Sequence, residues 1–154
     1  MSKEVEPAEV MHFLNTLYSR YDMLLDEWGV YKVETVGDCY VVAGGLIHKD
    51  KDGFGCVVRD NSGSHAHDVF GFAKAMVSEA QKVLMPHNQQ PVLLRVGLHT
   101  GPIVSGIIGT RMPKFCLFGD AMNTASRMES TCLEGGWVDG GRDHDANVGE
   151  VMRS

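Results

Sequence analysis

The chain has 154 residues, a formal net charge of −6 at pH 7 and four cysteines. This length suffices for one domain with a buried core but is short for two. The acidic balance, without a Lys/Arg-rich run, argues against a nucleic-acid-binding groove, so a nucleotide substrate would need a metal or local positive charge.

The cysteines and the apolar segments give no sign of secretion or membrane insertion. Cys39, Cys56, Cys116 and Cys132 form no CxxC pair, and no apolar N-terminal segment precedes a cleavage site. No apolar run approaches the ~20 residues that span a bilayer. We therefore expect reduced thiols in a cytoplasmic segment without direct membrane contact, although a parent protein can be membrane-anchored elsewhere.

The first predicted element is an amphipathic helix that starts at Ala8. Pro7 stands near its start, and Gly29 follows its last turn. Apolar side chains recur at helical spacing and form the stripe that faces the core. They are Val10, Phe13, Leu14, Leu17, Tyr21, Leu24 and Leu25.

A β-hairpin is predicted next, over residues 30–43. Two apolar, β-branched runs flank a Gly37-Asp38 pair, which is typical of a tight turn with one carboxylate at its tip. Alternation along the first arm predicts that Lys32 and Glu34 share a face. A lone glutamate on a strand is usually solvated, so spacing alone does not establish a site here.

The elements after the hairpin follow a loop rich in turn residues. They are a helix over 66–83, a strand over 92–100 and, after a Gly101-Pro102 turn, an antiparallel return strand over 103–108. A strand over 114–118 and a helix whose first turns span 123–128 follow. In that last helix Asn123 and Arg127 are four residues apart and project from one face. Such a pair is usually just an exposed face, but here an anion can reach both side chains and the positive helix start.

The order of elements predicts an α+β domain with an antiparallel-rich sheet and helices on one face. Beyond Thr131 the periodic pattern ends. We therefore expect one folded domain over residues 8–134 and a disordered tail over residues 135–154.

Three segments carry a resemblance to a known family: KVETVGDCY, LRVGLHTGPIVSG and MPKFCLFGDAMNTASRMES. In this order and at this separation they resemble the class III nucleotide cyclase catalytic domain, specifically its guanylyl cyclase branch. The resemblance covers roughly Glu9 to Thr131 and implies that residues 8–134 form an incomplete guanylyl cyclase-like catalytic domain. A generic ferredoxin-like binding domain would leave the coincidence of three motifs unexplained.

The resemblance implies a ferredoxin-like core that works as a head-to-tail homodimer or heterodimer, with active sites at the shared interface. It implies conversion of GTP to 3′,5′-cyclic GMP and pyrophosphate with two Mg²⁺ or Mn²⁺ ions. By the same resemblance, Asp38 matches one of two metal-binding aspartates. Asn123 and Arg127 match the pair that orients the ribose and stabilises the pentavalent phosphorus.

Three further positions point to the base. Glu34 stands where guanylyl cyclases carry glutamate and adenylyl cyclases carry lysine, and a carboxylate is complementary to the N1–H and N2–H₂ donors of guanine. Cys116 resembles the guanylyl-type cysteine at a position where adenylyl cyclases tend to carry aspartate. Lys114 stands where a guanylyl-type arginine is usual, which keeps the charge but loses the planar fork.

The chain departs from the family pattern at both ends. The family's other metal aspartate lies on a strand before the first helix, and its triphosphate-binding lysine lies near the C-terminus; neither has a counterpart here. A homodimer of this chain is therefore expected to have weak activity or none, although the chain can complete one site of a full-length subunit. An adenylyl cyclase and a non-catalytic or half-site dimerisation partner remain the alternatives.

Overall fold

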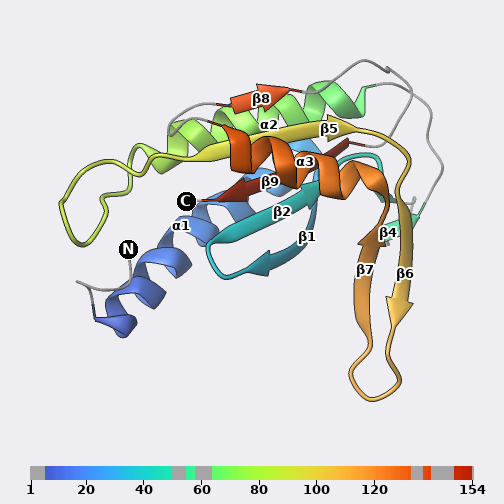
Figure 1. Ribbon diagram of the computed structural model, residues 1–154, viewed down its shortest axis with the longest axis horizontal. Helices are drawn as coiled ribbons and strands as arrows, with labels where there is room; N and C mark the ends of the chain where they lie inside the picture. Colours follow the sequence, from blue (N-terminus) through green and yellow to red (C-terminus); the bar gives the residue numbers. More distant parts are fainter. Residues whose placement is uncertain (1–5, 50–54, 58–63, 133–136, 140–147, 154) are drawn as a thin grey trace.

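The computed structural model describes residues 6–49, 55–57, 64–132, 137–139 and 148–153 (Figure 1). Its helices are α1 (Pro7–Trp28), α2 (His65–Ala80) and α3 (Asp120–Thr131). Its strands are β1 (Tyr31–Val36), β2 (Cys39–Ala43), β3 (Ile47–Lys49), β4 (Gly55–Val57), β5 (Arg95–Thr100), β6 (Val104–Ile108), β7 (Lys114–Phe118), β8 (Trp137–Asp139) and β9 (Val148–Arg153). None of the described helices is both long enough and apolar enough to cross a membrane.

The first helix confirms the sequence prediction at both ends. Pro7 occupies the start of α1, where a missing backbone N–H costs nothing, and Gly29 closes the helix in the left-handed conformation with φ of 61°. The stripe of Phe13, Leu17 and Tyr21 is buried. This stripe holds α1 against α2 and the sheet.

The central sheet has the strand order β1-β2-β9-β5-β8. The pair β5–β8 is parallel, and the other pairs are antiparallel. This confirms the α+β class and the antiparallel-rich sheet. The main core lies between this sheet and the two helices α1 and α2, and its largest fully buried side chains are Tyr21, Tyr40, Phe72, Leu17 and Met76.

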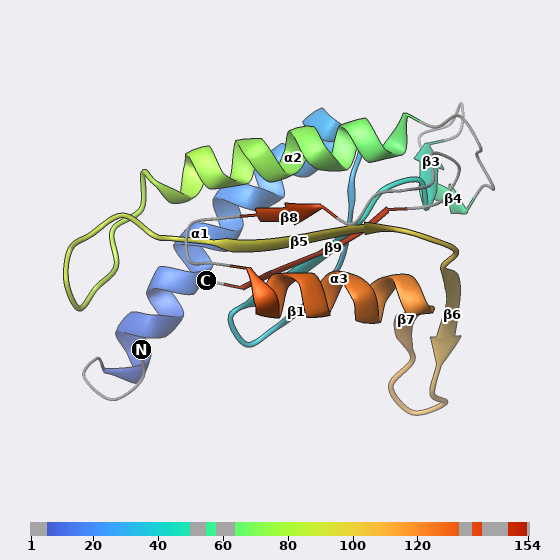
Figure 2. The ribbon, with the colours of Figure 1, turned by 45° about the horizontal axis from the view of Figure 1, so that its top comes forward.

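The helices differ in one respect from the expected arrangement, because they do not all lie on one face. Figure 2 shows α1 and α2 on one side of the sheet and α3 on the other. Val42 and Val96 point toward α1 and α2, whereas their neighbours Val41 and Gly97 face α3. Side chains alternate across a strand, so each strand contributes to both layers.

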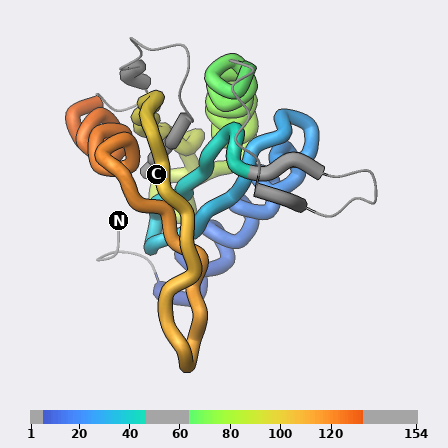
Figure 3. The backbone as a smooth tube through the Cα atoms, turned by 90° about the vertical axis from the view of Figure 1, so that its right-hand side faces the viewer, coloured from blue at the N-terminus to red at the C-terminus, as the bar shows by residue number. Residues whose placement is uncertain are grey.

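The predicted hairpin between the strands at 92–100 and 103–108 is wrong. β6 pairs with β7, from Val104 opposite Phe118 to Ile108 opposite Lys114, and forms an arm (residues 104–118) that projects from the body (Figure 3). The reason lies at the expected turn. Gly101 is buried against Ala121 of α3, and Pro102 has no N–H to donate to a ladder.

The expectation of a disordered tail is wrong for two of its segments. β8 and β9 both belong to the central sheet, and β9 lies between β2 and β5. Neither segment has a strong hydrophobic period, so only pairing with distant strands defines it. Residues 140–147 lie outside the described residues, and the division of the chain into 8–134 and 135–154 stays a prediction.

Candidate active site

The Gly37-Asp38 turn joins β1 to β2 as predicted. Gly37 takes the left-handed conformation with φ of 61°, which glycine adopts without steric cost. The Tyr18 hydroxyl on α1 donates a hydrogen bond to the Gly37 carbonyl over 3.1 Å. Burial, with a smaller contribution from the charge of Asp38, raises the pKa of Tyr18 to about 12, so this hydroxyl keeps its proton.

A β-bulge in β1 separates the two charged residues that were expected on one face. The pairing shifts between Lys32, opposite Val42, and Glu34, opposite Val41. Lys32 therefore points toward α1, where its ammonium lies 2.8 Å from a carboxylate oxygen of Asp22. Glu34 points to the opposite face, toward β7. Bulges commonly redirect a side chain in this way beside active sites.

Glu34 forms an ion pair with Lys114 at the start of β7. The hydrogen bond to Glu34 and the negative charge of its carboxylate raise the pKa of the Lys114 ammonium, and a weaker charge interaction with Cys116 acts in the same direction. The rings of Tyr31 and Phe115 pack edge to face with centroids 5.7 Å apart and hold β1 against β7. The structure thus brings Glu34, Lys114 and Cys116 together, and the Glu34 side chain keeps 35% of its surface exposed.

The other two predicted residues lie on the outer face of α3. Asn123 and Arg127 are exposed, whereas Ala121, Ala125 and Glu129 form the buried face of the helix. Since α3 follows β7 directly, Gly119 connects this helix to the strand that carries Lys114 and Cys116. Asn123 and Arg127 are therefore available to a ligand outside the core.

Two features that hold α3 in place were not recognised from the sequence. The helix lies directly on the backbone of Gly97, where a Cβ would be 2.2 Å from the Ala125 carbonyl oxygen. The Arg95 guanidinium lies 3.1 Å from a carboxylate oxygen of Glu129, which is almost completely buried. Gly97 itself was the sequence signal for this contact, because a glycine inside an apolar strand often marks a place where another backbone approaches closely.

The described residues contain no group of three or more His, Cys, Asp or Glu side chains that could hold a metal ion. Asp38 can offer its carboxylate to a cation, but Mg²⁺ and Mn²⁺ need about six ligands. The described part of one chain therefore does not build a complete metal centre.

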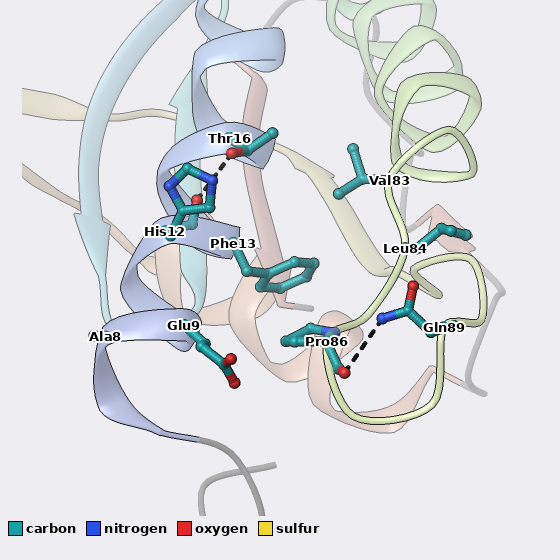
Figure 4. A pocket seen from close by; sticks show the side chains of 9 residues that line it. All are labelled: Ala8, Glu9, His12, Phe13, Thr16, Val83, Leu84, Pro86 and Gln89. Carbon is teal, nitrogen blue, oxygen red and sulfur yellow. Dashed lines mark hydrogen bonds between the residues drawn. The ribbon is translucent and has the colours of Figure 1, made fainter.

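A cavity of about 590 Å³ lies elsewhere, between the first half of α1 and the segment after α2 (Figure 4). Phe13 and Pro86 lie across it from each other, and the Gln89 amide donates to the Pro86 carbonyl over 3.4 Å. None of the six predicted site residues lines this cavity. It is therefore separate from the candidate active site.

Comparison with known proteins identifies the family of this chain. Residues 1–136 match the family described as adenylate and guanylate cyclase catalytic domain. Guanylate cyclase soluble subunit beta-2 of Rattus norvegicus is 45% identical over 125 residues, which make up 81% of this chain but only 17% of that protein.

Two solved structures share the fold. The non-canonical dimeric guanylyl cyclase domain of the RhoGC fusion protein from Blastocladiella emersonii has a TM-score of 0.71 and 36% identity, and the match covers 90% of this chain and 69% of that one. The guanylate cyclase domain of RhGC from Catenaria anguillulae in complex with GTP has a TM-score of 0.74 and 28% identity, with coverage of 99% and 87%. The chain therefore belongs to the adenylate and guanylate cyclase catalytic domain family.

Proposed function

We propose that this chain carries the guanine-recognising half of a guanylyl cyclase active site, which converts GTP to 3′,5′-cyclic GMP and pyrophosphate. The observation that carries this proposal is the placement of Glu34, which the bulge directs toward β7 and which Lys114 holds in an ion pair. The complex of the related RhGC domain with GTP supports GTP as the ligand.

Glu34 and Cys116 are proposed to read the base. The Glu34 carboxylate accepts hydrogen bonds from N1–H and N2–H₂ of guanine, whereas adenine presents an acceptor at N1. Cys116 lies two residues from Lys114 on β7 and thus on the same face of that strand. Lys114 acts mainly through Glu34, because its ammonium is already paired with that carboxylate.

The proposed reaction is an in-line attack of the ribose 3′-oxygen on the α-phosphorus. The new O3′–P bond forms as the bond from the α-phosphorus to the pyrophosphate oxygen breaks, pyrophosphate leaves, and the proton of the 3′-hydroxyl passes to water. Asn123 is proposed to bind the ribose. Arg127 is proposed to bind the charge that develops on the α-phosphate, for which a guanidinium is well suited.

Cyclase catalytic domains use divalent metal ions, and we propose two Mg²⁺ or Mn²⁺ ions for this site. Asp38 is proposed as one carboxylate ligand. The other ligands would come from triphosphate oxygens, water and a carboxylate outside the described residues. When bound, such ions neutralise the charge of the triphosphate.

The site is proposed to form between two subunits, in a homodimer or a heterodimer. A related guanylyl cyclase domain was solved as a non-canonical dimer, so such a domain can pair with a second copy. Four apolar residues of the arm, Val104, Ile107, Ile108 and Met112, are each more than half exposed, and a second subunit can cover this apolar surface. One subunit would then contribute Asp38, and its partner would contribute the residues that bind the base, ribose and phosphate.

Replacing the base-reading pair should change the nucleotide preference. The double variant Glu34→Lys, Cys116→Asp presents a donor to N1 of adenine and an acceptor to its amino group, so we expect the GTP:ATP preference to fall by roughly 10- to 100-fold. The measurement is cyclic GMP and cyclic AMP formation in Mn²⁺ by the chain mixed with a complete cyclase subunit.

A matched control is Glu27→Lys, which makes the same charge change on an exposed part of α1 and should leave the preference unaltered. Adding Lys114→Gln to the double variant removes the repulsion between two adjacent lysines. If the preference stays the same in the double and the triple variant, Glu34 and Cys116 do not read the base.

Two other functions would give different results when the chain is mixed with a complete cyclase subunit. An adenylyl cyclase would form cyclic AMP in preference to cyclic GMP with the unmodified chain. A purely regulatory dimerisation partner would change the activity of the complete subunit, but the change would survive substitution of Asn123 and Arg127.

A further inference from the structure

One carboxylate on α1 holds both strands of the hairpin that carries Glu34. Asp22 accepts hydrogen bonds from the Lys32 ammonium of β1, at 2.8 and 3.1 Å, and from the Tyr40 hydroxyl of β2, at 2.5 Å. The Lys32 ammonium also lies 4.9 Å from the centroid of the Tyr40 ring, which is buried. These contacts fix Lys32 on the side of β1 that faces α1.

The pairing of the two strands shows what this attachment prevents. Next to the turn the register is regular, and it places Glu34 opposite Val41. Continued without a bulge, the same register would place Lys32 opposite Ala43, because a step along one antiparallel strand matches a step back along the other. Lys32 lies opposite Val42 instead. Since side chains alternate across a strand, a regular β1 would carry Lys32 on the face of Glu34.

A second ammonium beside Glu34 would weaken the selection of guanine. Glu34 is already paired with Lys114, and Lys32 would compete with guanine for the same carboxylate. An ammonium has only donors, so it is unfavourable next to the N1–H of guanine and favourable next to the N1 acceptor of adenine. The site therefore depends on keeping Lys32 on the α1 side of the strand.

We propose that Asp22 is a positioning residue for base selection, which holds Lys32 on the α1 side of β1 and thereby keeps a second ammonium away from Glu34. The inference rests on the proposed function in taking Glu34 as the residue that reads guanine. Asp22 itself lies on the other side of the hairpin from Glu34. The packing of Tyr31 against Phe115 also favours the bulge, so loss of Asp22 shifts a balance between two registers.

The first measurement is the GTP:ATP preference of the chain in Mn²⁺, mixed with a complete cyclase subunit whose counterparts of Asn123 and Arg127 are changed to alanine. Only the site that contains Glu34 of this chain is then active. Asp22→Lys replaces the attraction to Lys32 with repulsion. We expect the preference to fall by roughly 2- to 10-fold, the effect of one net hydrogen bond on the balance between the registers.

Two further variants separate this role from a general loss of stability. Glu27→Lys makes the same charge change on an exposed part of α1 and should leave the preference within about twofold. Adding Lys32→Met to Asp22→Lys removes the other end of the ion pair, but it leaves no ammonium at position 32 that could reach Glu34. The preference should therefore return to within about twofold of the unmodified chain.

The outcomes of this assay are decisive for the role of Asp22. An unchanged preference in Asp22→Lys would overturn the proposal. A lowered preference that Lys32→Met does not restore would also overturn it, because Asp22 would then support the hairpin without controlling the position of Lys32.

The second measurement reads the register of the hairpin directly, without nucleotide or metal. Cross-strand NOEs in the isotope-labelled chain should connect Lys32 with Val42 in the unmodified protein and in Glu27→Lys. Asp22→Lys should add NOEs between Lys32 and Ala43. If Lys32 stays opposite Val42 alone in Asp22→Lys, the carboxylate does not hold the bulge and the inference is wrong.

Failure of this inference and failure of the proposed function can be told apart. The variant Glu34→Lys, Cys116→Asp tests the base-reading residues themselves. If that variant changes the preference and Asp22→Lys does not, Glu34 reads the base and Asp22 has no part in positioning. If that variant leaves the preference unchanged, the proposed function fails, and this inference fails with it.

Discussion

Ending the chain at residue 147, before β9, is expected to abolish cooperative unfolding. β9 pairs with β2 over five residue pairs and with β5 over six, and it is the strand that joins these two halves of the described sheet. At about 1 kcal/mol of net stability per hydrogen bond, its loss removes roughly 5–10 kcal/mol. That is comparable to the whole stability of a typical domain.

Thermal unfolding followed by circular dichroism measures this effect. The chain ending at 147 should show a broad, non-cooperative change, whereas a chain that lacks only Ser154 should melt like the intact protein. A sharp transition at the original temperature in the shorter chain would mean that the pairing of β9 contributes little to the fold.

The second large effect is expected for Gly97→Ala. A Cβ on Gly97 would lie 2.2 Å from the Ala125 carbonyl oxygen and 2.3 Å from the Glu129 amide nitrogen, both of which are backbone atoms of α3. The helix must therefore move away from β5, at the cost of 1–3 kcal/mol or more that is typical of overpacking. The movement also strains the ion pair between Arg95 and Glu129.

The displacement should also reduce activity, because α3 carries Asn123 and Arg127. A shift of about 1 Å in positioned groups can cost on the order of 100-fold in rate. We expect Gly97→Ala to lower the melting temperature by several degrees and cyclic GMP formation in the mixture with a complete subunit by at least about 10-fold.

Gly106→Ala is the control for stability. Gly106 also lies within a strand, but a Cβ there would meet nothing within 4 Å. The melting temperature of the Gly106→Ala variant should match that of the unmodified chain. If Gly97→Ala is equally stable, α3 does not lie on Gly97 as closely as the structure indicates.

The elements that could be predicted from the sequence are those defined by residues close together in the chain. The hairpin was recognised because Gly37-Asp38 and the flanking β-branched runs lie next to one another, and α1 was recognised from its apolar period between Pro7 and Gly29. Such features depend on nearby residues, so a pattern in the chain is enough to identify them.

The features that the sequence did not predict depend on partners far along the chain. The separation of Lys32 from Glu34 requires the bulge, which alternation cannot reveal, and the pairing of β6 with β7 depends on how Gly101 packs against α3. β9 has weak strand character of its own and is defined by β2 and β5 on either side.

Some features of the candidate site could be predicted from the sequence, and others could not. The resemblance identified the positions of Glu34, Cys116 and Lys114, and the structure brings these three together. The contacts that support the site, from Tyr18 to the turn and from Gly97 to α3, became visible only with the fold.

A complementation assay tests the proposed function most directly. A complete guanylyl cyclase subunit whose counterparts of Asn123 and Arg127 are changed to alanine keeps its metal-binding carboxylates but cannot bind ribose and phosphate, so it should be inactive alone. Mixing it with this chain in Mn²⁺ and GTP should restore cyclic GMP formation, and Arg127→Ala in this chain should abolish the restored activity. No restored activity, or restored activity that survives Arg127→Ala, would contradict the proposal that this chain supplies half of a GTP-cyclising site.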